Sequence, residues 1–542
     1  MHDDTQVERV FEMQKSLSDG MFPVRWVANL GYGYGYPIFN YYAPLAYYVG
    51  GVFNLVGVDA LIATKLMMGI GIVLAGIFMY LLAREFWGKT GAIISSVLYL
   101  YAPYHAVDIY VRGDVAEFWA YAFIPLAFWG IYKTFLFTGK KIPWIWIITA
   151  ALGYAGVILS HNLSAMMLTP FLLLFAAILF VYSCFHSSRT KGYFLFAGFF
   201  LGIMLSAFYW LPALSETGYT NVSSVITGGS QYKDHFVCLP QLWNSPWGFG
   251  GSAPGCIDGL SFKVGKFHIL LALLSASPLV YFWKKSKIVF ILIIYAIIAL
   301  LFSVFLTLQQ SKFLWDMLTP MAFFQFPWRF LVLISFFTSF LSGALFFMLS
   351  NIVAKRKIMQ LVFLVFSITI TLGIIMTNAK LFVPQKVLQK TTIDYTNLRT
   401  LEWETSQMSD EYLPKNFAKP TSIQSIPTSR FSQVENPFRV ISVNTSPKNI
   451  FAKISARKQT RIRINQAFFP GWKLFLDKTQ ISEIDSNKGI IFTLPKGTHI
   501  INLQYHQTNV ELFSDFLSMA GILVILAGII CSKITTYGSK KK

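Results

Sequence analysis

The chain has 542 residues, of which 55% are hydrophobic and 13% charged, and its formal net charge is +20. Soluble globular domains carry about 25% charged residues, so this composition excludes an ordinary soluble domain. The positive charge does not indicate a nucleic-acid partner. The lysines and arginines cluster in short loops between apolar runs, where such residues set membrane topology.

Eleven apolar runs come close to the roughly 20 residues that cross a bilayer, which predicts a polytopic α-helical membrane protein. These runs lie at 60–83, 90–104, 117–136, 143–158, 163–183, 193–211, 266–283, 287–307, 322–349, 357–377 and 514–531. Alternate loops between them are basic, which places those loops and the C-terminal tail in the cytoplasm. Loop 105–116, loop 212–265 and the block 380–513 are then expected outside.

The first 58 residues are expected to form an external loop with interfacial helices. Thr5 and Glu8 have the spacing of a capping box, which predicts a helix that begins after Thr5. The apolar stretch 41–58 contains Pro44 and a glycine pair, and we interpret it as a re-entrant or interfacial helix. An external N-terminus of this length without a signal peptide is hard to export. We therefore expect a further transmembrane helix, the twelfth, to precede this loop in the complete protein.

Asp3 and Asp4 stand directly before the first predicted helix. They are either acids stabilised by the helix dipole or carboxylates held at the water–lipid boundary as a general base or metal ligand. The run GYGYGYP at 31–37 lacks the Lys-Ser/Thr of a phosphate-binding loop, and we interpret it as a flexible aromatic loop that contacts sugar.

Ionisable residues crowd the loop and span start APYHAVDIYVRGDVAEFWA at 102–120. They are His105, Asp108, Arg112, Asp114 and Glu117. Ionisable groups at membrane depth are costly and usually face a cavity or a partner. Two interpretations stay open and are compatible: a salt bridge from Arg112 to Asp108 or Glu117 that orders the loop, or a functional cluster.

Two further polar residues lie at predicted span ends. His161, in a tight external hairpin, is either a capping group or a site residue. Arg329, in FQFPWRFL at 324–331, lies about seven residues into its predicted span, or roughly 10 Å. It is either a snorkelling arginine or a guanidinium that binds the phosphate of a lipid carrier.

Cys238 and Cys256 share the external loop 212–265, so they form either a disulfide or two free thiols. The block 380–513 alternates with period two in TRIRINQAFF and THIINLQYH. Strands are predicted at 438–444, 460–468, 472–477, 490–495 and 498–505. The chain therefore divides into a first external loop, a transmembrane core, an external β-sandwich-like domain, and a final span with a basic tail. Their limits are 1–58, 59–379, 380–513 and 514–542.

Several of these motifs together resemble the GT-C superfamily of membrane glycosyltransferases. They are PVRW at 23–26, GYGYPIF at 33–39, YAPL at 42–45, YVRGDVAE at 110–117, SHNL at 160–163, SPWGFGGS at 245–252, FPWRF at 326–330 and FFPGWKLFLD at 468–477. The resemblance covers nearly the whole chain. It is to the group akin to the YfhO membrane proteins, some of which are labelled "6-pyruvoyl-tetrahydropterin synthase-related".

This resemblance implies a hexosyltransferase that uses a polyprenyl-phosphate-linked sugar and inverts configuration on the external face. The acceptor would be a glycan, a glycolipid or a protein of the cell envelope. The family's catalytic carboxylate lies in the first external loop, where Asp3 and Asp4 match. The expected substrate-binding residues are Arg25, Asp108, Arg112, Asp114, Glu117, His161 and Arg329. A divalent metal such as Mg²⁺ or Mn²⁺ would help the leaving phosphate, although some superfamily members work without one.

Non-enzymatic functions form the main alternative: a transporter or flippase for lipid-linked sugars, or an assembly factor. Transporters favour acids near the bilayer midplane and inverted repeats. Here the acids gather at the external ends of the predicted spans, and no repeat is visible in the sequence. A third interpretation is a degenerate relative, in which the β domain binds glycan and the core is inert.

Overall fold

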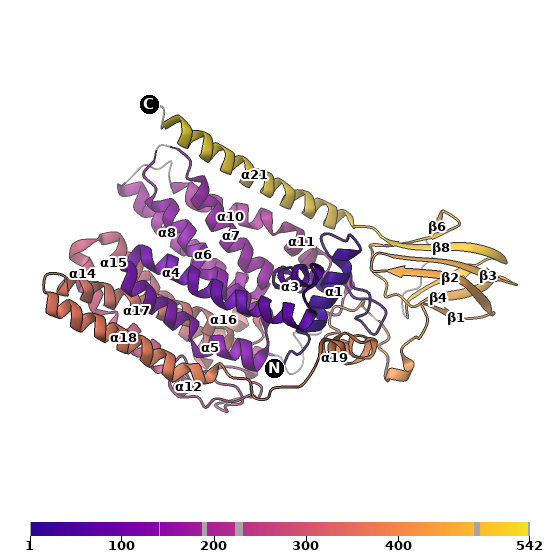
Figure 1. Cartoon of the computed structure of the whole chain (residues 1–542), viewed down its shortest axis with the longest axis horizontal. Coiled ribbons are helices and arrows are strands. Elements are labelled where there is room, and N and C mark those ends of the chain that lie inside the picture. The colour runs from indigo at the N-terminus through magenta and orange to yellow at the C-terminus, as the bar shows by residue number, and fades with distance from the viewer. Residues whose placement is uncertain are drawn as a thin grey trace.

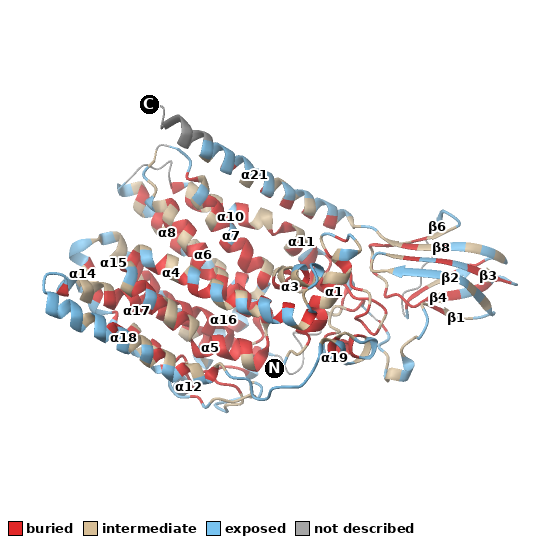
Figure 2. Cartoon of the chain, in the orientation of Figure 1, coloured by how far each residue is buried: buried red, intermediate tan, exposed pale blue. Residues whose placement is uncertain are grey.

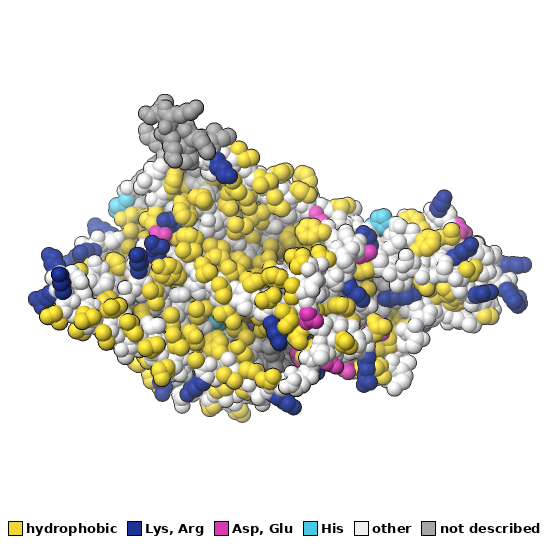
Figure 3. Space-filling model, viewed as in Figure 1, with side chains coloured by type: hydrophobic (Ala, Val, Ile, Leu, Met, Phe, Trp, Pro, Cys, Tyr) yellow, Lys and Arg dark blue, Asp and Glu magenta, His cyan; other side chains and the backbone are white. Residues whose placement is uncertain are grey.

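The computed structural model describes residues 2–139, 141–186, 192–222, 231–415, 417–481 and 488–539. Helices form an elongated body, and a β domain projects from one end of it (Figure 1). Hydrophobic side chains cover much of the visible face of the helical body, while Lys and Arg gather at the end opposite the β domain and on that domain (Figure 3). This distribution is that of a polytopic helical membrane protein, as the sequence predicted.

Three helices belong to the first segment. They are α1 (Gln6–Ser18), α2 (Ile38–Tyr41) and α3 (Leu45–Leu55). With 11 residues, α3 is about 16 Å long, too short for a hydrocarbon core of about 30 Å. A Cβ added to Gly50 or Gly51 would lie within 2.7 Å of Val10 or Met13 of α1. The glycine pair therefore lets α3 pack closely against α1.

The membrane region is built from longer helices and two bent pairs. They are α4 (Ala60–Leu100), α6 (Val115–Leu136), α7 (Trp144–Ser160), α8 (Asn162–His186), α10 (Phe194–Leu205) with α11 (Ala207–Ser215), α13 (Lys266–Leu274) with α14 (Ser277–Lys285), α15 (Lys287–Thr307), α17 (Leu331–Val353), α18 (Lys357–Asn378) and α21 (Asn509–Ser539). By length and composition, seven helices of the described residues can cross a membrane, or nine if each bent pair is one span.

The helix α4 is not straight, because it turns back at Gly88. This residue has φ +62° and ψ −169°, a conformation open almost only to glycine. Beyond the turn, the Ser96 hydroxyl donates to the Gly76 carbonyl at 2.8 Å, so the two halves lie antiparallel. They correspond to the predicted spans 60–83 and 90–104. With the 17-residue α7, all eleven predicted spans fall on helices.

The helix α17 lies at the centre of the bundle and α18 and α21 at its edge (Figure 2). In the most apolar stretch around α17, 94% of residues are buried, against 11% around α18 and 22% in α21. The exposed residues of α18 and α21 are largely apolar, as expected for helices that face lipid.

Short helical elements connect the spans. They are α5 (Pro103–Ala106), η1 (Val107–Arg112), η2 (Thr217–Tyr219), η4 (Tyr232–Asp234), α12 (Leu239–Trp243), η5 (Gln309–Ser311), α16 (Lys312–Met317), η6 (Thr319–Phe324), η7 (Pro327–Phe330), η8 (Ala379–Leu381), α19 (Thr392–Thr396), η9 (Thr400–Thr405), α20 (Ser406–Met408) and η10 (Ile423–Ser425). Because α17 begins only at Leu331, Arg329 lies in the turn before the helix. The expectation that Arg329 lies seven residues inside the span is therefore wrong.

The β domain contains two antiparallel sheets, of strand order β1-β4-β7 and β2-β3-β8-β5-β6. The strands are β1 (Phe431–Gln433), β2 (Phe438–Ser446), β3 (Asn449–Ala456), β4 (Thr460–Ile464), β5 (Trp472–Leu476), β6 (Thr479–Ile481), β7 (Ile490–Leu494) and β8 (Gly497–Tyr505). Buried side chains from both sheets form one core, so the domain is a β-sandwich, as predicted. The five predicted strands correspond to β2, β4, β5, β7 and β8.

The β domain and the first segment share a hydrophobic core. Trp26 packs edge-on against Trp472 of β5, with ring centroids 5.4 Å apart, and the Ala467 amide donates to the Tyr34 carbonyl at 2.7 Å. Tyr32, Tyr34 and Tyr36 are all buried. The glycine-rich run 31–37 is therefore packed, and the expectation of a flexible loop is wrong.

Candidate functional site

The N-terminal residues dock on the loop that precedes α6. The backbone amides of His2 and Asp3 donate to the carbonyl oxygens of Val111 and Arg112, at 2.9 and 2.8 Å. The Asp3 carboxylate pairs with Arg9 at 3.2 Å. The backbone bonds to Val111 and Arg112 place Asp3 beside the loop that holds most of the ionisable residues.

Arg112 is the centre of a buried ionic cluster. Its Nη1 donates to Asp108 Oδ1 at 2.5 Å and to Glu117 Oε2 at 2.7 Å, and its Nη2 donates to Asp114 Oδ2 at 2.5 Å. Asp108 and Glu117 are fully buried, and Arg112 is 8% exposed. Both salt bridges considered from the sequence are therefore present, and Asp114 adds a third.

The local backbone explains how three carboxylates reach one guanidinium. The π-helical turn η1 carries Asp108 and Arg112 and ends at Gly113, which has φ +70°. The chain then reverses into α6, whose N-cap is Asp114; the Asp114 Oδ1 accepts from the Glu117 amide at 3.0 Å. Residues before and after the turn thus reach the same guanidinium.

Two residues distant in sequence complete this site. Arg329 Nε lies 3.8 Å from Glu117 Oε2, and one oxygen or nitrogen of each of Asp114, Glu117 and His161 lies within 4.8 Å of the others. We call Asp108, Arg112, Asp114, Glu117, His161 and Arg329 the Arg112 cluster. The His161 Nδ1 also lies 2.8 Å from the Ser164 hydroxyl, in the first turn of α8.

Arg329 has unused hydrogen-bonding capacity. It is 8% exposed, yet its Nε and Nη1 find no hydrogen-bond partner among the described residues. A buried unpaired donor costs about 1–3 kcal/mol, and more when charged. Such a group in a native protein requires an explanation, and a bound anionic oxygen would supply one.

The pKa values of the two aspartates in the loop are shifted in opposite directions. Burial raises the pKa of Asp108 well above its usual range, and the neighbouring Glu117 raises it further. Burial also acts to raise the pKa of Asp114, but Arg112, His161 and Arg329 outweigh it and hold that pKa below its usual range. Asp114 is therefore ionised at neutral pH.

The cluster can hold a divalent cation. Asp114, Glu117 and His161 offer two carboxylates and one imidazole, a donor set that suits Mn²⁺ or Zn²⁺ and, through its oxygens, Mg²⁺. Arg112 already donates to both carboxylates, but each carboxylate oxygen has a second lone pair.

The structure separates Asp4 from Asp3. Asp4 lies on the side of Glu8, where burial raises the Glu8 pKa to about 7 with a smaller contribution from Asp4. Thr5 is the N-cap of α1, as predicted, but its side chain makes no capping bond. It donates instead to Asp3 Oδ1 at 2.6 Å, so the predicted capping box is wrong.

Arg25 lies outside the cluster. Its Nη2 pairs with Asp515 of the final span at 2.5 Å, and its Nη1 donates to Asn40 Oδ1 and to the Phe208 carbonyl. Arg25 is 2% exposed and holds the first segment to α21 and α11. Among the described residues, Arg25 Nε finds no hydrogen-bond partner, and substrate binding by Arg25 stays a prediction.

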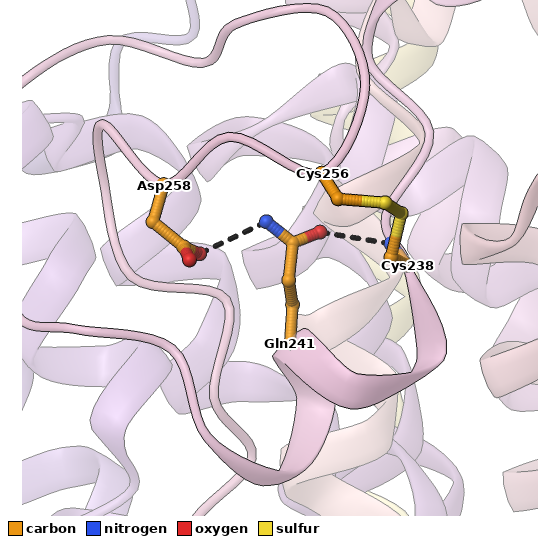
Figure 4. Close-up of a disulfide and its surroundings, with 4 residues drawn as sticks. All are labelled: Cys238, Gln241, Cys256 and Asp258. Carbon is orange, nitrogen blue, oxygen red and sulfur yellow. Dashed lines mark hydrogen bonds between the residues drawn. A yellow bond between two sulfur atoms is a disulfide. The ribbon is translucent and has the colours of Figure 1, made fainter.

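Cys238 and Cys256 form a disulfide within the loop 212–265. Gln241 braces it: Gln241 Oε1 accepts from the Cys238 amide at 2.8 Å and its Nε2 donates to Asp258 Oδ1 at 2.9 Å (Figure 4). Of the two alternatives left open by the sequence, the structure has the bridge.

Two aromatic residues of the site were not singled out from the sequence. The Tyr104 hydroxyl donates to Glu117 Oε1 at 2.6 Å and accepts from Arg112 at 3.1 Å. The Arg112 guanidinium lies 4.8 Å from the centroid of Trp328, a cation–π contact. Tyr104 precedes Asp108 by four residues, the helical spacing that could have revealed it.

An apolar groove of about 540 Å³ lies between α12, α13, α15 and α17. Its lining includes Trp243, Ile297, Ile334 and Leu341, with Thr338 as a single hydroxyl. Ile334 lies in the first turn of α17, five residues beyond Arg329 in sequence.

Comparison with known proteins agrees with the resemblance seen in the motifs. A family model described as "6-pyruvoyl-tetrahydropterin synthase related domain; membrane protein" matches residues 39–228. That part of the chain is therefore similar to this family of membrane proteins, in agreement with the resemblance seen in the motifs. An uncharacterized protein of Lactococcus lactis subsp. cremoris (strain MG1363) is 26% identical over 224 residues, which are 40% of this chain and 36% of that relative.

Two solved structures of the Archaeoglobus fulgidus oligosaccharyltransferase are also similar. The apo form has 14% sequence identity and a TM-score of 0.48, over 79% of this chain and 58% of that chain. AglB in complex with an inhibitory peptide and a dolichol-phosphate has 13% identity and a TM-score of 0.46, over 79% and 57%. The aligned part is thus little more than half of those chains, and about a third of the curated relative.

Proposed function

We propose that the protein is an integral membrane glycosyltransferase of the GT-C type. It transfers a sugar from a polyprenyl-phosphate-linked donor to a cell-envelope acceptor on the extracytoplasmic face. The β domain and the Arg112 cluster lie on that face, and the basic loops and the tail lie in the cytoplasm, in accordance with the positive-inside rule.

One observation carries the proposal: Arg329 is buried beside carboxylates and has two unpaired donor groups. A guanidinium in this state suits a phosphate, whose oxygens match its fork geometry. We assign the hydrocarbon chain of the same donor to the apolar groove that Ile334 helps to line. A lipid phosphate combines both chemistries in one molecule.

In the proposed reaction the acceptor hydroxyl oxygen attacks the anomeric carbon of the donor sugar. A new carbon–oxygen bond forms, and the bond between that carbon and the phosphate oxygen breaks. Asp3 takes the proton of the hydroxyl, and the phosphate leaves with the electron pair, held by Arg329. Asp114, Glu117 and His161 would hold a divalent cation, which would supply further charge for the leaving phosphate.

The position of the cluster favours an enzyme over a transporter. Asp114 precedes α6, His161 precedes α8, and Arg329 precedes α17. The charged groups therefore gather at helix ends, whereas transporters place their coupling sites near the middle of the membrane.

Transfer from a radiolabelled polyprenyl-phosphate sugar, measured with the full chain in membranes, tests the proposal. We expect Arg329→Gln to lower transfer about 100-fold or more, the usual effect of removing one group that stabilises developing charge. Arg399→Gln is the matched control, because Arg399 is exposed and pairs only with Glu404 at 3.7 Å. Equal transfer by the two variants would exclude the phosphate-binding role.

The same assay distinguishes the two candidate bases, Asp3 and Asp4. Asp3→Asn should abolish transfer, and Asp4→Asn, beside Glu8, should have the smaller effect. Asp234→Asn, in an exposed turn, controls for the loss of a carboxylate. Full activity in Asp3→Asn would remove this residue from the mechanism.

A further inference from the structure

A polar cleft lies between the C-terminal end of α1 and the β domain. It encloses about 330 Å³, within the range of small-ligand sites. Lys15 and Asp19 line it from the first segment, and Arg430 and Ser446 line it from the β domain. Since α1 has 13 residues, the cleft lies about 20 Å along that helix from Asp3.

Two buried donor groups in this cleft have no partner. Trp26 and Gln466 line the cleft and are 1% and 2% exposed, yet Trp26 Nε1 and Gln466 Nε2 make no hydrogen bond within the described residues. A Cβ added to Gly35 would lie 2.3 Å from the first and 2.8 Å from the second. Both donors therefore pack against the backbone of Gly35, where only a residue without a side chain leaves them room.

The surrounding polar groups are fixed by bonds of their own. Arg430 donates to the Gly33 carbonyl at 2.6 Å, and the Asn29 side chain donates to Glu12 Oε1 at 2.6 Å. The first of these bonds ties the first segment to the β domain, and the second braces the first segment itself. A ligand would then bind without the cost of ordering the walls.

The chemistry of the lining points to a neutral ligand rich in hydroxyls. The cleft offers N–H donors together with acidic and hydroxyl acceptors such as Asp19 and Ser446. The positive charges of Lys15 and Arg430 are opposed by Asp19 in the lining and by Glu12 behind Asn29. A sugar hydroxyl both donates and accepts, so it matches such a mixed and balanced surface, whereas a free anion would leave acceptors unused.

We infer that this cleft binds a neutral sugar unit of a glycan. Sugar binding itself follows from the lining. The further statement that the bound glycan is the acceptor, held about 20 Å from the reacting end, rests on the proposed function.

The test uses the full chain in detergent and two uncharged probes, chitotetraose and maltotetraose. Saturation-transfer NMR measures binding of each. We expect at least one probe to bind, and Gln466→Met, which keeps the side-chain length and removes the donor, to weaken binding about fivefold, as for one lost hydrogen bond. Gln480→Met is the matched control, because Gln480 is exposed on β6 of the same domain.

The outcomes separate this inference from the proposed function. Asp114→Asn should leave probe binding unchanged, since Asp114 belongs to the Arg112 cluster. The inference is wrong if neither probe binds the wild type, if Gln466→Met and Gln480→Met bind equally, or if inorganic phosphate binds in place of the sugars. Sugar transfer is measured separately, so loss of transfer activity with intact probe binding would count against the proposed function alone.

Discussion

Removal of the Arg112 charge should destabilise the protein strongly. In Arg112→Met the side chain still fills its space, but three carboxylates, two of them fully buried, lose the group that bridges them at 2.5–2.7 Å. Breaking a buried ion pair by removing one partner costs about 3–5 kcal/mol. The shift per kcal/mol falls with chain length, to about 1–2 °C for a chain of this size, so the unfolding midpoint should fall by about 3–10 °C.

Thermal unfolding of the detergent-solubilised chain measures this effect. The double variant Arg112→Met/Glu117→Gln should recover part of the loss, because it also removes one of the stranded charges. Arg399→Gln, at an exposed pair, should shift the midpoint by less than about 1 °C. A midpoint of Arg112→Met as high as that of the wild type would refute the buried ionic cluster.

Three other predictions concern the rest of the chain. Burial raises the folded-state pKa of Glu8 to about 7 from 4.5, so the folded state binds more protons than the unfolded state between these values. The free energy of unfolding should therefore fall as pH rises from about 5 to 8. Glu8→Gln should flatten this pH dependence, and an unchanged pH dependence would contradict the raised pKa of Glu8. Gly88→Ala places a side chain at φ +62° and should cost more than about 1 kcal/mol, seen as a lower yield of monodisperse protein; a wild-type yield and midpoint would exclude the sharp turn. Without reductant, a maleimide should label two of the four cysteines of the denatured chain, and four after reduction, because Cys238 and Cys256 are paired; four labels before reduction would exclude the bridge.

The apolar runs and the charge distribution of the sequence predicted most of the fold. The spans were visible because each crosses a hydrophobic layer of fixed thickness, and the basic loops separated neighbouring spans, as Arg84 and Lys89 did on either side of Gly88. The strand β3 was missed although it alternates, with Ile450, Ala452 and Ile454 buried. Its small Ala452 and its lysine at 453 weaken the hydrophobic signal, and burial in a sheet centre depends on neighbours that the sequence does not place.

The candidate site was visible in part for a similar reason. Asp108, Arg112, Asp114 and Glu117 are neighbours in sequence, so their grouping needed no tertiary knowledge. His161 and Arg329 were noted one by one, and only the packing of α6, α8 and α17 brings them to the same place. Arg25 looked like a site residue in PVRW, but its partner Asp515 lies 490 residues away.

Predictions from weak local patterns were wrong where tertiary contacts determine the structure. Thr5 and Glu8 have the spacing of a capping box, yet the Thr5 hydroxyl donates to the nearby Asp3 carboxylate instead. The tyrosines of GYGYGYP looked mobile because glycines surround them, but each found a partner in a distant segment: Tyr34, for instance, packs edge-on against Phe417 at 5.0 Å. Local sequence cannot show such partners.

The pairing of Trp26 with Trp472 has a consequence for biogenesis. The ribosome adds about 5–20 residues per second, so the second tryptophan is made about 20–90 s after the first. Until then the apolar side of the opening segment lacks the surface that it packs against in the finished protein. The hydrophobic core that the first segment shares with the β domain can therefore close only after the last strand, β8, has been synthesised.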